Sequence, residues 1–381
     1  MAATDPSFGH FGQGALKAWN SGRGGLRLYQ PVKPSRFLAV VVLVVPACFG
    51  QTGPQLTPLR ILEETPIPTL QVSSMGLRAV AGDGEFYVQT GLGKYTAVDL
   101  EGETHVALDI SKVPATDSMN PQDLFVVDLA QAPRGGVIAV VWWNETPKAQ
   151  RAGVLRFDEH GDFSSLLWLD AAFIPTHVAE FSSAGDFLVT GYDEHSKVHV
   201  ALVNSRGTMV IPQVLPYGDA EVASGNKAPG QAGQPSDQSI REASLIQLVS
   251  GDDNAVYLYN PSFGRKVIRI QPSGQSTEIA LPPPFPEGES TLPLQMYVSH
   301  SSLYLYEAIL DKGQKTEEVT ELKRFAISVY DRYSGTLNAS FRVDSGSGLI
   351  PVALSPKEFH LLDAKVLPGG ELSFSLIRSG P

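Results

Sequence analysis

The sequence predicts an all-β fold built from six similar units of four antiparallel strands. Apolar alternating runs that meet a turn closed by glycine recur at residues 95–102, 154–161, 200–207, 267–274, 327–335 and 374–380. Each run follows another short apolar run rich in β-branched or aromatic residues, such as residues 137–143 and 255–259. Only residues 316–325 show any helical period. Repeated units of this size predict the blades of a β-propeller.

The two ends of the chain are expected to close the ring. The sixth unit ends at the C-terminus without a fourth strand, and a spare strand around residues 59–62 can supply it. Closure of this kind removes exposed sheet edges. Seven blades are the alternative, if residues 218–238 hide a degenerate unit. That segment is rich in Gly, Pro and polar residues, so we expect a flexible loop there.

The blade pattern resembles that of six-bladed β-propellers of the TolB-like or NHL-like kind, over roughly residues 55–381. The resemblance is carried by the spacing of strands and turns and includes no family-specific motif. It therefore implies the fold and assigns no functional residue.

Short polar side chains recur before the glycines of the repeated turns. Asp99, Asp158 and Asn204 stand three residues before their glycine, and Asp331 stands four before. Side chains of this kind accept hydrogen bonds from the turn backbone, so we expect a structural role for all four.

Residues 1–50 are interpreted as a leader that precedes a single propeller domain, residues 51–381. Lys33 and Arg36 stand before an apolar run at residues 37–47, which is typical of a secretory signal peptide. The run is too short for a stable membrane span, which needs about 20 residues. Cleavage between Gly50 and Gln51 is expected, and the protein is predicted to be secreted or periplasmic.

The single cysteine, Cys48, lies in this leader, so the mature domain has no disulfide. An exported chain without disulfides favours a bacterial source. A lipid anchor at Cys48 is disfavoured by Pro46, and a buried strand or membrane anchor is the other alternative for the apolar run. The formal net charge of −11 disfavours nucleic acid and anionic membranes as partners.

Long connections are expected on one face of the disc, because alternate strand connections emerge on opposite faces. The connections between the first and second strands are short. The longer ones are residues 111–123, 144–153, 218–238, 282–294 and 311–324. Loops on a rigid scaffold commonly carry binding sites, so this loop-rich face is the predicted binding surface.

The strongest candidate binding cluster is Trp142, Trp143, Asn144 and Glu145, at the end of a second strand. Aromatic rings beside an amide and a carboxylate can stack on and hydrogen-bond a peptide or sugar. The alternative is that both tryptophans pack in the core.

Three further candidates are His177, near the channel or the loop-rich face, and Asp193 with Glu194, in the equivalent loop of the third unit. His195 and His199 are four residues apart on an extended segment, about 13 Å, so a shared metal ion is not expected. No metal ligand set, catalytic residue or cofactor is assigned.

These observations favour an exported binding or scaffold protein that recognises a protein, peptide or glycan through the loop-rich face. The alternative is a propeller enzyme, a lyase, hydrolase or lactonase, with its site at the mouth of the central channel. Such enzymes place convergent polar residues from several blades there. The sequence shows no evenly spaced set of this kind, so binding is preferred over catalysis.

Overall fold

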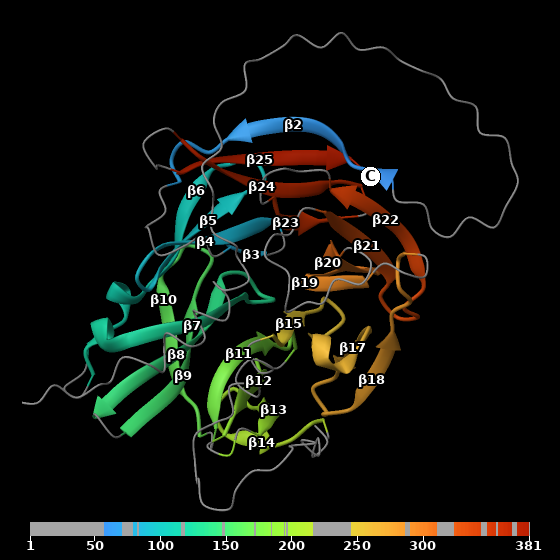
Figure 1. The fold of residues 1–381 in the computed structure, drawn as a ribbon. Helices are drawn as coiled ribbons and strands as arrows, with labels where there is room; N and C mark the ends of the chain where they lie inside the picture. Colours follow the sequence, from blue (N-terminus) through green and yellow to red (C-terminus); the bar gives the residue numbers. More distant parts are fainter. Residues whose placement is uncertain are drawn as a thin grey trace, which may run out of the picture.

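Six antiparallel sheets form a ring of blades in the computed structural model of the protein (Figure 1). The prediction of an all-β, six-bladed propeller is confirmed. The structure describes residues 57–70, 79–81, 84–115, 119–146, 149–170, 173–183, 185–193, 195, 197–215, 245–285, 290–310, 324–343, 349–355, 357–367 and 372–380.

Each blade takes its strands in chain order from the inside of the ring to the outside. Blade 1 comprises β3 (Ala79–Ala81), β4 (Glu85–Gly91), β5 (Lys94–Asp99) and β6 (Thr104–Asp109). Blade 2 comprises β7 (Leu124–Gln131), β8 (Val137–Thr146), β9 (Ala149–Phe157) and β10 (Phe163–Trp168). Blade 3 comprises β11 (Ile174–Glu180), β12 (Phe187–Tyr192), β13 (Val198–Val203) and β14 (Met209–Ile211). Blade 4 comprises β15 (Gln247–Ser250), β16 (Val256–Tyr259), β17 (Lys266–Ile270) and β18 (Ser276–Ala280). Blade 5 comprises β19 (Ser290–Ser299), β20 (Ser302–Leu310), β21 (Phe325–Asp331) and β22 (Leu337–Val343). The first three strands of blade 6 are β23 (Ile350–Leu354), β24 (Phe359–Val366) and β25 (Leu372–Gly380).

The N-terminal segment closes the ring. Strand β2 (Arg60–Pro66) pairs antiparallel with β25 and supplies the fourth strand of blade 6, as predicted, although it is longer than the expected residues 59–62. Strand β1 (Thr57–Pro58), just before it, pairs parallel with β22 of blade 5. One short segment thus lies along the outer edges of two consecutive blades (Figure 1).

One predicted turn is wrong. Gly380 does not close a turn; it is the last residue of β25 and lies opposite Arg60. The pairing with β2 holds the chain extended there, so the final copy of the repeat keeps its strand and loses its turn.

Glycines at the other repeated turns serve packing as well as turn geometry. Gly161, Gly207 and Gly335 all have positive φ, which favours glycine. A Cβ on Gly161 would lie 1.8 Å from the carbonyl oxygen of Val106, in the outer strand of blade 1. The corresponding distances are 2.2 Å from Gly207 to the Trp168 carbonyl and 2.1 Å from Gly335 to the Ala280 carbonyl. Each turn therefore packs against the outer strand of the preceding blade at a distance that only glycine allows.

The polar residues of these turns bond the backbone as expected. The Asp158 carboxylate accepts hydrogen bonds from the amides of His160 and Asp162, each at 2.9 Å. Asp99, Asn204 and Asp331 accept equivalent pairs of amide hydrogen bonds in their own turns. The structural role predicted for these side chains is confirmed.

The core lies between neighbouring blades. The second strands are buried on both faces, as their continuous apolar runs predict; residues 137–141 of β8, for example, are all fully buried. Their side chains form separate apolar clusters between consecutive sheets, each with residues from two blades. The core is thus a set of interblade layers.

Two predicted loops are shorter than expected. The connection at residues 144–153 is mostly strand, because Asn144 pairs with Gln150 and extends the β8–β9 hairpin to Thr146 and Ala149. The connection at 282–294 ends early, since β19 begins at Ser290. Residues 111–123 contain two short 3-10 turns, η1 (Ile110–Lys112) and η2 (Pro121–Asp123). The predicted loops at 218–238 and 311–323, and with them most of the helical-period segment 316–325, lie outside the described residues.

Side-chain hydrogen bonds link short turns on one face of the disc from blade to blade. The Arg134 guanidinium of blade 2 donates to the carbonyls of Ser182 and Ser183 in blade 3. The Asn254 side chain of blade 4 accepts from the Ser182 hydroxyl and the Ser183 amide. Asp252 in the same turn of blade 4 accepts from Arg332 of blade 5, whose side chain is 3% exposed. The short-turn face of blades 2 to 5 is therefore held by side-chain hydrogen bonds.

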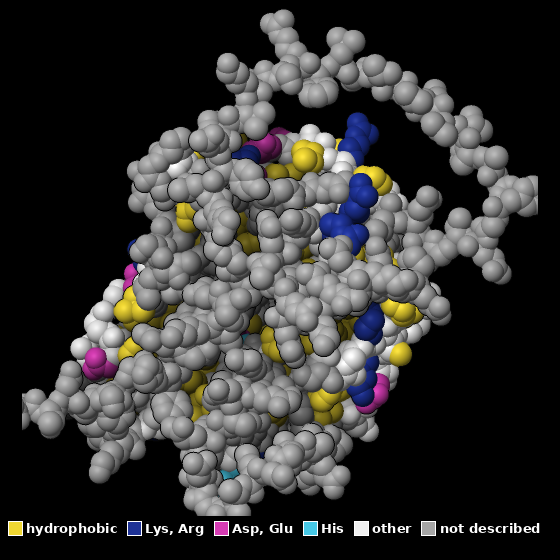
Figure 2. All heavy atoms as spheres, in the orientation of Figure 1, with side chains coloured by type: hydrophobic (Ala, Val, Ile, Leu, Met, Phe, Trp, Pro, Cys, Tyr) yellow, Lys and Arg dark blue, Asp and Glu magenta, His cyan; other side chains and the backbone are white. Residues whose placement is uncertain are grey.

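Basic side chains are unevenly placed over the surface. Figure 2 shows Lys and Arg side chains in a row along the edge where β18 and β22 lie. Within the described part of the chain, no helix is long and apolar enough to cross a membrane.

Candidate functional site

A cavity of about 340 Å³ lies between blades 1 and 2, beside the connection that joins them. Val113 and Met119 come from that connection, which lies on the face predicted to be loop-rich. Trp143 comes from β8, and the outer strand β10 supplies the remaining apolar wall with Leu166 and Trp168. The lining residues therefore come from blade 2 and from the connection that joins it to blade 1, and none of them belongs to a described strand of blade 1.

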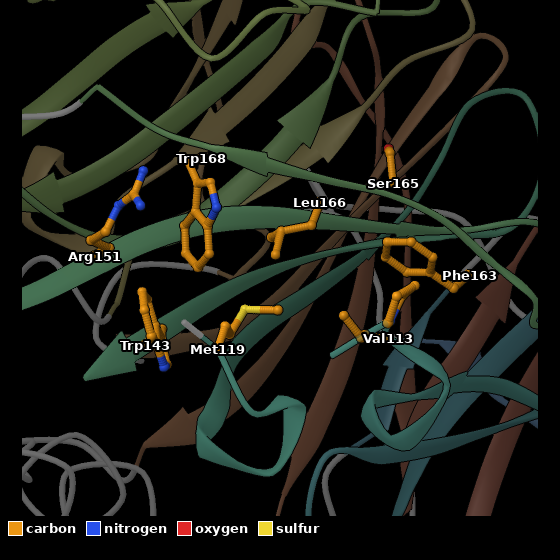
Figure 3. A pocket seen from close by; sticks show the side chains of 9 residues that line it. Val113, Met119, Trp143, Arg151, Phe163, Ser165, Leu166 and Trp168 are labelled. Carbon is orange, nitrogen blue, oxygen red and sulfur yellow. The ribbon is translucent and has the colours of Figure 1, made fainter. Parts of the chain in front are cut away.

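The cavity is elongated, with different chemistry at its two ends. Figure 3 shows Trp143, Trp168 and Arg151 together at one end, and Phe163 and Ser165 at the other. The rings of Trp143 and Trp168 are 5.6 Å apart and inclined by 37°. The Arg151 guanidinium lies over the Trp168 ring, 4.6 Å from its centroid.

Strand pairing explains how these groups come together. Trp143 of β8 lies opposite Arg151 of β9, and Gly153 of β9 lies opposite Trp168 of β10. A side chain at Gly153 would meet the Leu167 carbonyl at 3.0 Å and the Trp168 ring at 3.1 Å. The missing side chain therefore leaves the space that the Trp168 ring occupies above the sheet.

The structure separates the two adjacent tryptophans of the predicted cluster. Successive side chains of a strand point to opposite faces of the sheet, so Trp143 lines the cavity between blades 1 and 2 while Trp142 points toward blade 3. The Trp142 indole nitrogen donates a 3.0 Å hydrogen bond to the Pro175 carbonyl. That carbonyl lies beside a bulge in β11, between Pro175 and His177. Trp142 is thus a link between blades 2 and 3.

The other two members of that cluster lie at the end of the β8–β9 hairpin. Asn144 is exposed and pairs through its backbone with Gln150. Glu145 belongs to β8, but its side chain is outside the described part. Asn144 is not among the described residues that line the cavity.

His177 lies in a different place. It belongs to β11, the first strand of blade 3, and its Nδ1 is 3.3 Å from the Asp128 carboxylate of β7 in blade 2. The same carboxylate accepts a 3.4 Å hydrogen bond from the Val178 amide. Both side chains are partly buried, and the pair joins the inner strands of two blades, apart from the tryptophan cavity.

Asp193 is held by its own turn. Its Oδ1 accepts hydrogen bonds from the amides of His195 and Lys197, each at 2.9 Å, and its Oδ2 lies 2.9 Å from His199 Nε2. Burial acts to raise the pKa of Asp193, but the hydrogen bonds from His199 and the two amides lower it more, so the net pKa is lowered. Glu194 lies outside the described residues.

His199 stacks on Phe173, with centroids 5.1 Å apart and an interplanar angle of 6°. His195 and His199 thus serve the Asp193 turn in different ways, one through its amide and one through its ring. Among the described residues, no group of three or more His, Cys, Asp or Glu side chains is placed to hold a metal ion.

A buried polar network between blades 4 and 5 carries no sequence signal. Glu307 of β20 is fully buried and forms an ion pair with Arg265. The Glu307 carboxylate also accepts hydrogen bonds from Thr291 at 3.0 Å and Ser328 at 2.8 Å, and Arg265 donates to the Tyr330 hydroxyl at 2.6 Å. Most of these polar atoms are paired within the network, which is typical of a structural link, although Arg265 Nε has no hydrogen-bond partner among the described residues.

The comparisons with known proteins bear on the fold. No protein-family model matches the chain, and no curated protein matches it. Among solved structures, TolB from Acinetobacter baumannii matches with a TM-score of 0.38 and 10% sequence identity, over 74% of this chain and 59% of that chain. The chain thus spans less than two thirds of that protein. The pairing of its strands makes the chain a six-bladed β-propeller.

Proposed function

We propose that this protein is an exported binding protein that captures a protein or peptide by seating an apolar side chain in the cavity between blades 1 and 2. The single observation that carries the proposal is the cavity itself. Its volume of about 340 Å³ falls within the range of about 300–1,000 Å³ that is typical of ligand pockets. Trp168, which is only partly buried, provides a rigid aromatic contact surface of the kind that binding sites commonly use.

The lining favours a peptide over a glycan. Arg151 and Ser165 are the polar side chains among the lining residues, and most of the wall is apolar. A sugar brings many hydroxyl groups that would lose their hydrogen bonds to water in such a site. Trp143 is also only 4% exposed, so little of its ring is free for a sugar to stack on. An aliphatic or aromatic side chain matches this lining better.

Export rests on the leader. The basic residues before the apolar run at 37–47 favour a signal peptide, and cleavage after Gly50 would leave every described strand intact, since β1 begins at Thr57. Mass spectrometry of the protein recovered from the medium or periplasm tests this directly. A mature N-terminus at Gln51 is expected, and an intact residue 1 would refute export by this route.

Peptide binding is tested with blocked peptides that differ at one central residue, Phe, Leu or Ala, and with a neutral oligosaccharide as the glycan probe. Titrations followed by calorimetry should give saturable binding for the Phe and Leu peptides and none for the Ala peptide or the sugar. Ser165→Phe should abolish this binding, because Ser165 is exposed at the rim and the larger side chain would fill the cavity.

Ser164→Phe is the matched control. Ser164 is the exposed neighbour on the same strand and does not line the cavity, so this variant should bind like the native protein. Equal binding by the two variants, or no difference between Phe and Ala peptides, would refute the proposed site.

A further inference from the structure

We infer that the cavity selects an apolar residue with an adjacent carboxylate, and that Arg151 binds this carboxylate. The inference rests on the proposed peptide-binding function and specifies its ligand. The carboxylate can come from an acidic neighbour in the peptide or from the end of a peptide chain, since both present the same group.

The position of Arg151 is the first argument. The side chain is exposed at one end of the cavity, and its guanidinium lies over the Trp168 ring, 4.6 Å from the centroid. Stacking of this kind fixes the plane of the guanidinium and leaves its N–H edge open. That edge has the fork geometry that matches a carboxylate.

The absence of a protein carboxylate at Arg151 is the second argument. Five other arginines of the described part form ion pairs: Arg156 with Glu180, Arg265 with Glu307, Arg269 with Asp253, Arg332 with Asp252 and Arg378 with Glu63. Arg134 and Arg206 have no ion pair within this part of the chain either, and Arg151 differs from them in lining the cavity. Within the same described residues Arg151 forms no ion pair, although the chain carries 40 acidic residues against 29 basic ones. A cation left free beside an apolar cavity in an acidic protein is complementary to an anionic group on the ligand.

The shape of the cavity is the third argument. Arg151 stands at the Trp168 end, whereas Phe163 and Ser165 stand at the opposite end of β10 (Figure 3). These ends are separated by the length of β10, about 17 Å at the rise of an extended strand. Leu166 and Met119 lie between these ends (Figure 3), so a peptide lying along this strand can place its apolar side chain against them and its adjacent carboxylate at Arg151.

The test compares four peptides that each contain one Phe, of which the first three have blocked ends. The first has Glu beside Phe, the second has Gln in place of that Glu, the third has Lys there, and the fourth ends in Phe with a free carboxylate. Each is titrated into the purified full chain at low ionic strength. The Glu peptide should bind about three- to tenfold more tightly than the Gln peptide, and the Lys peptide more weakly than either.

Variants of Arg151 assign the effect. Arg151→Gln should bring the Glu and Gln peptides to equal affinity while leaving the Gln peptide within about twofold of its native affinity. Arg151→Lys should retain part of the preference, because the charge remains but the planar fork is lost. Arg206→Gln is the matched control: it removes an exposed arginine in the Asn204 turn, and the full preference should persist.

Each outcome bears on the inference. Equal binding of the Glu and Gln peptides by the native protein, or an unchanged preference in Arg151→Gln, would overturn it while the proposed function stands. Failure of every Phe peptide to bind would overturn both. Tighter binding of the free-carboxylate peptide than of the Glu peptide would identify the chain end as the source of the carboxylate.

Discussion

Replacing Gly161 with alanine should test why glycine closes the repeated turns. Gly161 has φ of 71°, and its missing Cβ would stand 1.8 Å from the Val106 carbonyl oxygen and 2.8 Å from the carbonyl carbon. Contacts this short cannot be relieved by rotating a side chain, because both partners are backbone. The turn of blade 2 would have to move away from the outer strand of blade 1.

The expected cost has two parts. The left-handed backbone conformation costs a residue with a Cβ about 1–2 kcal/mol. Forcing additional atoms into a packed site costs about 1–3 kcal/mol. Movement of the turn also disturbs the 2.7 Å hydrogen bond that Lys112 donates to the Gly161 carbonyl. Gly161→Ala should therefore lower the free energy of unfolding by about 2–5 kcal/mol.

Gly84→Ala and Gly264→Ala are the matched controls. Both glycines have positive φ, 82° and 76°, but a Cβ at either would have no neighbour within 4 Å. These variants should show the conformational cost alone, about 1–2 kcal/mol. The difference between Gly161→Ala and the controls measures the close approach between blades.

Urea unfolding followed by tryptophan fluorescence is a suitable assay, because Trp142, Trp143 and Trp168 all belong to blade 2. Far-UV circular dichroism should be recorded on the same samples, since coincident transitions justify a single free energy of unfolding. A loss of stability in Gly161→Ala no larger than in Gly84→Ala would refute the packing argument and leave only a turn preference.

Three further substitutions test other links in the ring. Glu307→Ala should lower the free energy of unfolding in urea by about 3–5 kcal/mol, because it leaves Arg265 without its buried partner. Ser340→Ala is the control and should cost far less, because it removes a buried hydroxyl that has no hydrogen-bond partner among the described residues. Trp142→Phe should cost about 1 kcal/mol for its lost interblade hydrogen bond and leave peptide affinity unchanged, and weaker peptide binding would contradict its assignment to the blade 3 side. Asp193 has a lowered pKa in the folded protein, so its contribution is complete above the unfolded value of about 3.9 and is lost as the pH falls through the lowered value. The unfolding midpoint of Asp193→Asn should accordingly fall less steeply than that of the native protein on acidification below about pH 5, and parallel profiles would show that this linkage is absent.

The fold could be predicted because its signals are local. The first and second strands of each blade are adjacent in sequence and joined by short connections, as are the third and fourth strands of blades 1 to 5, so alternation, turn residues and glycine spacing identify them together. Strand β16 (Val256–Tyr259), for example, covers all but the first residue of the apolar run identified at residues 255–259. The ends of hairpins could not be placed as well, because pairing such as that of Asn144 with Gln150 depends on backbone contacts that polar residues also allow.

The cavity could be predicted only in part, because its walls come from distant segments. Trp143 was a candidate on composition alone. Met119 lies in the connection before blade 2, and Trp168 lies at the end of the outer strand, so neither is near Trp143 in sequence. Their convergence follows from the packing of the connection between blades 1 and 2 against blade 2, for which a single sequence carries no signal. That Trp142 and Trp143 point to opposite faces of the sheet could have been inferred from strand alternation alone.

The two faces of the disc differ in role: one carries side-chain hydrogen bonds between blades, and the other carries the proposed binding cavity. On the short-turn face, Arg134, Asn254 and Asp252 link four consecutive blades, and the buried Arg332 takes part in the last of these links. Such links oppose relative movement of the blades on that side. The cavity lies beside the connection between blades 1 and 2, on the opposite face of the disc. Loosening the short-turn face, for example with Asn254→Ala, should therefore lower stability without changing peptide selectivity, whereas Arg151→Gln should change selectivity without lowering stability.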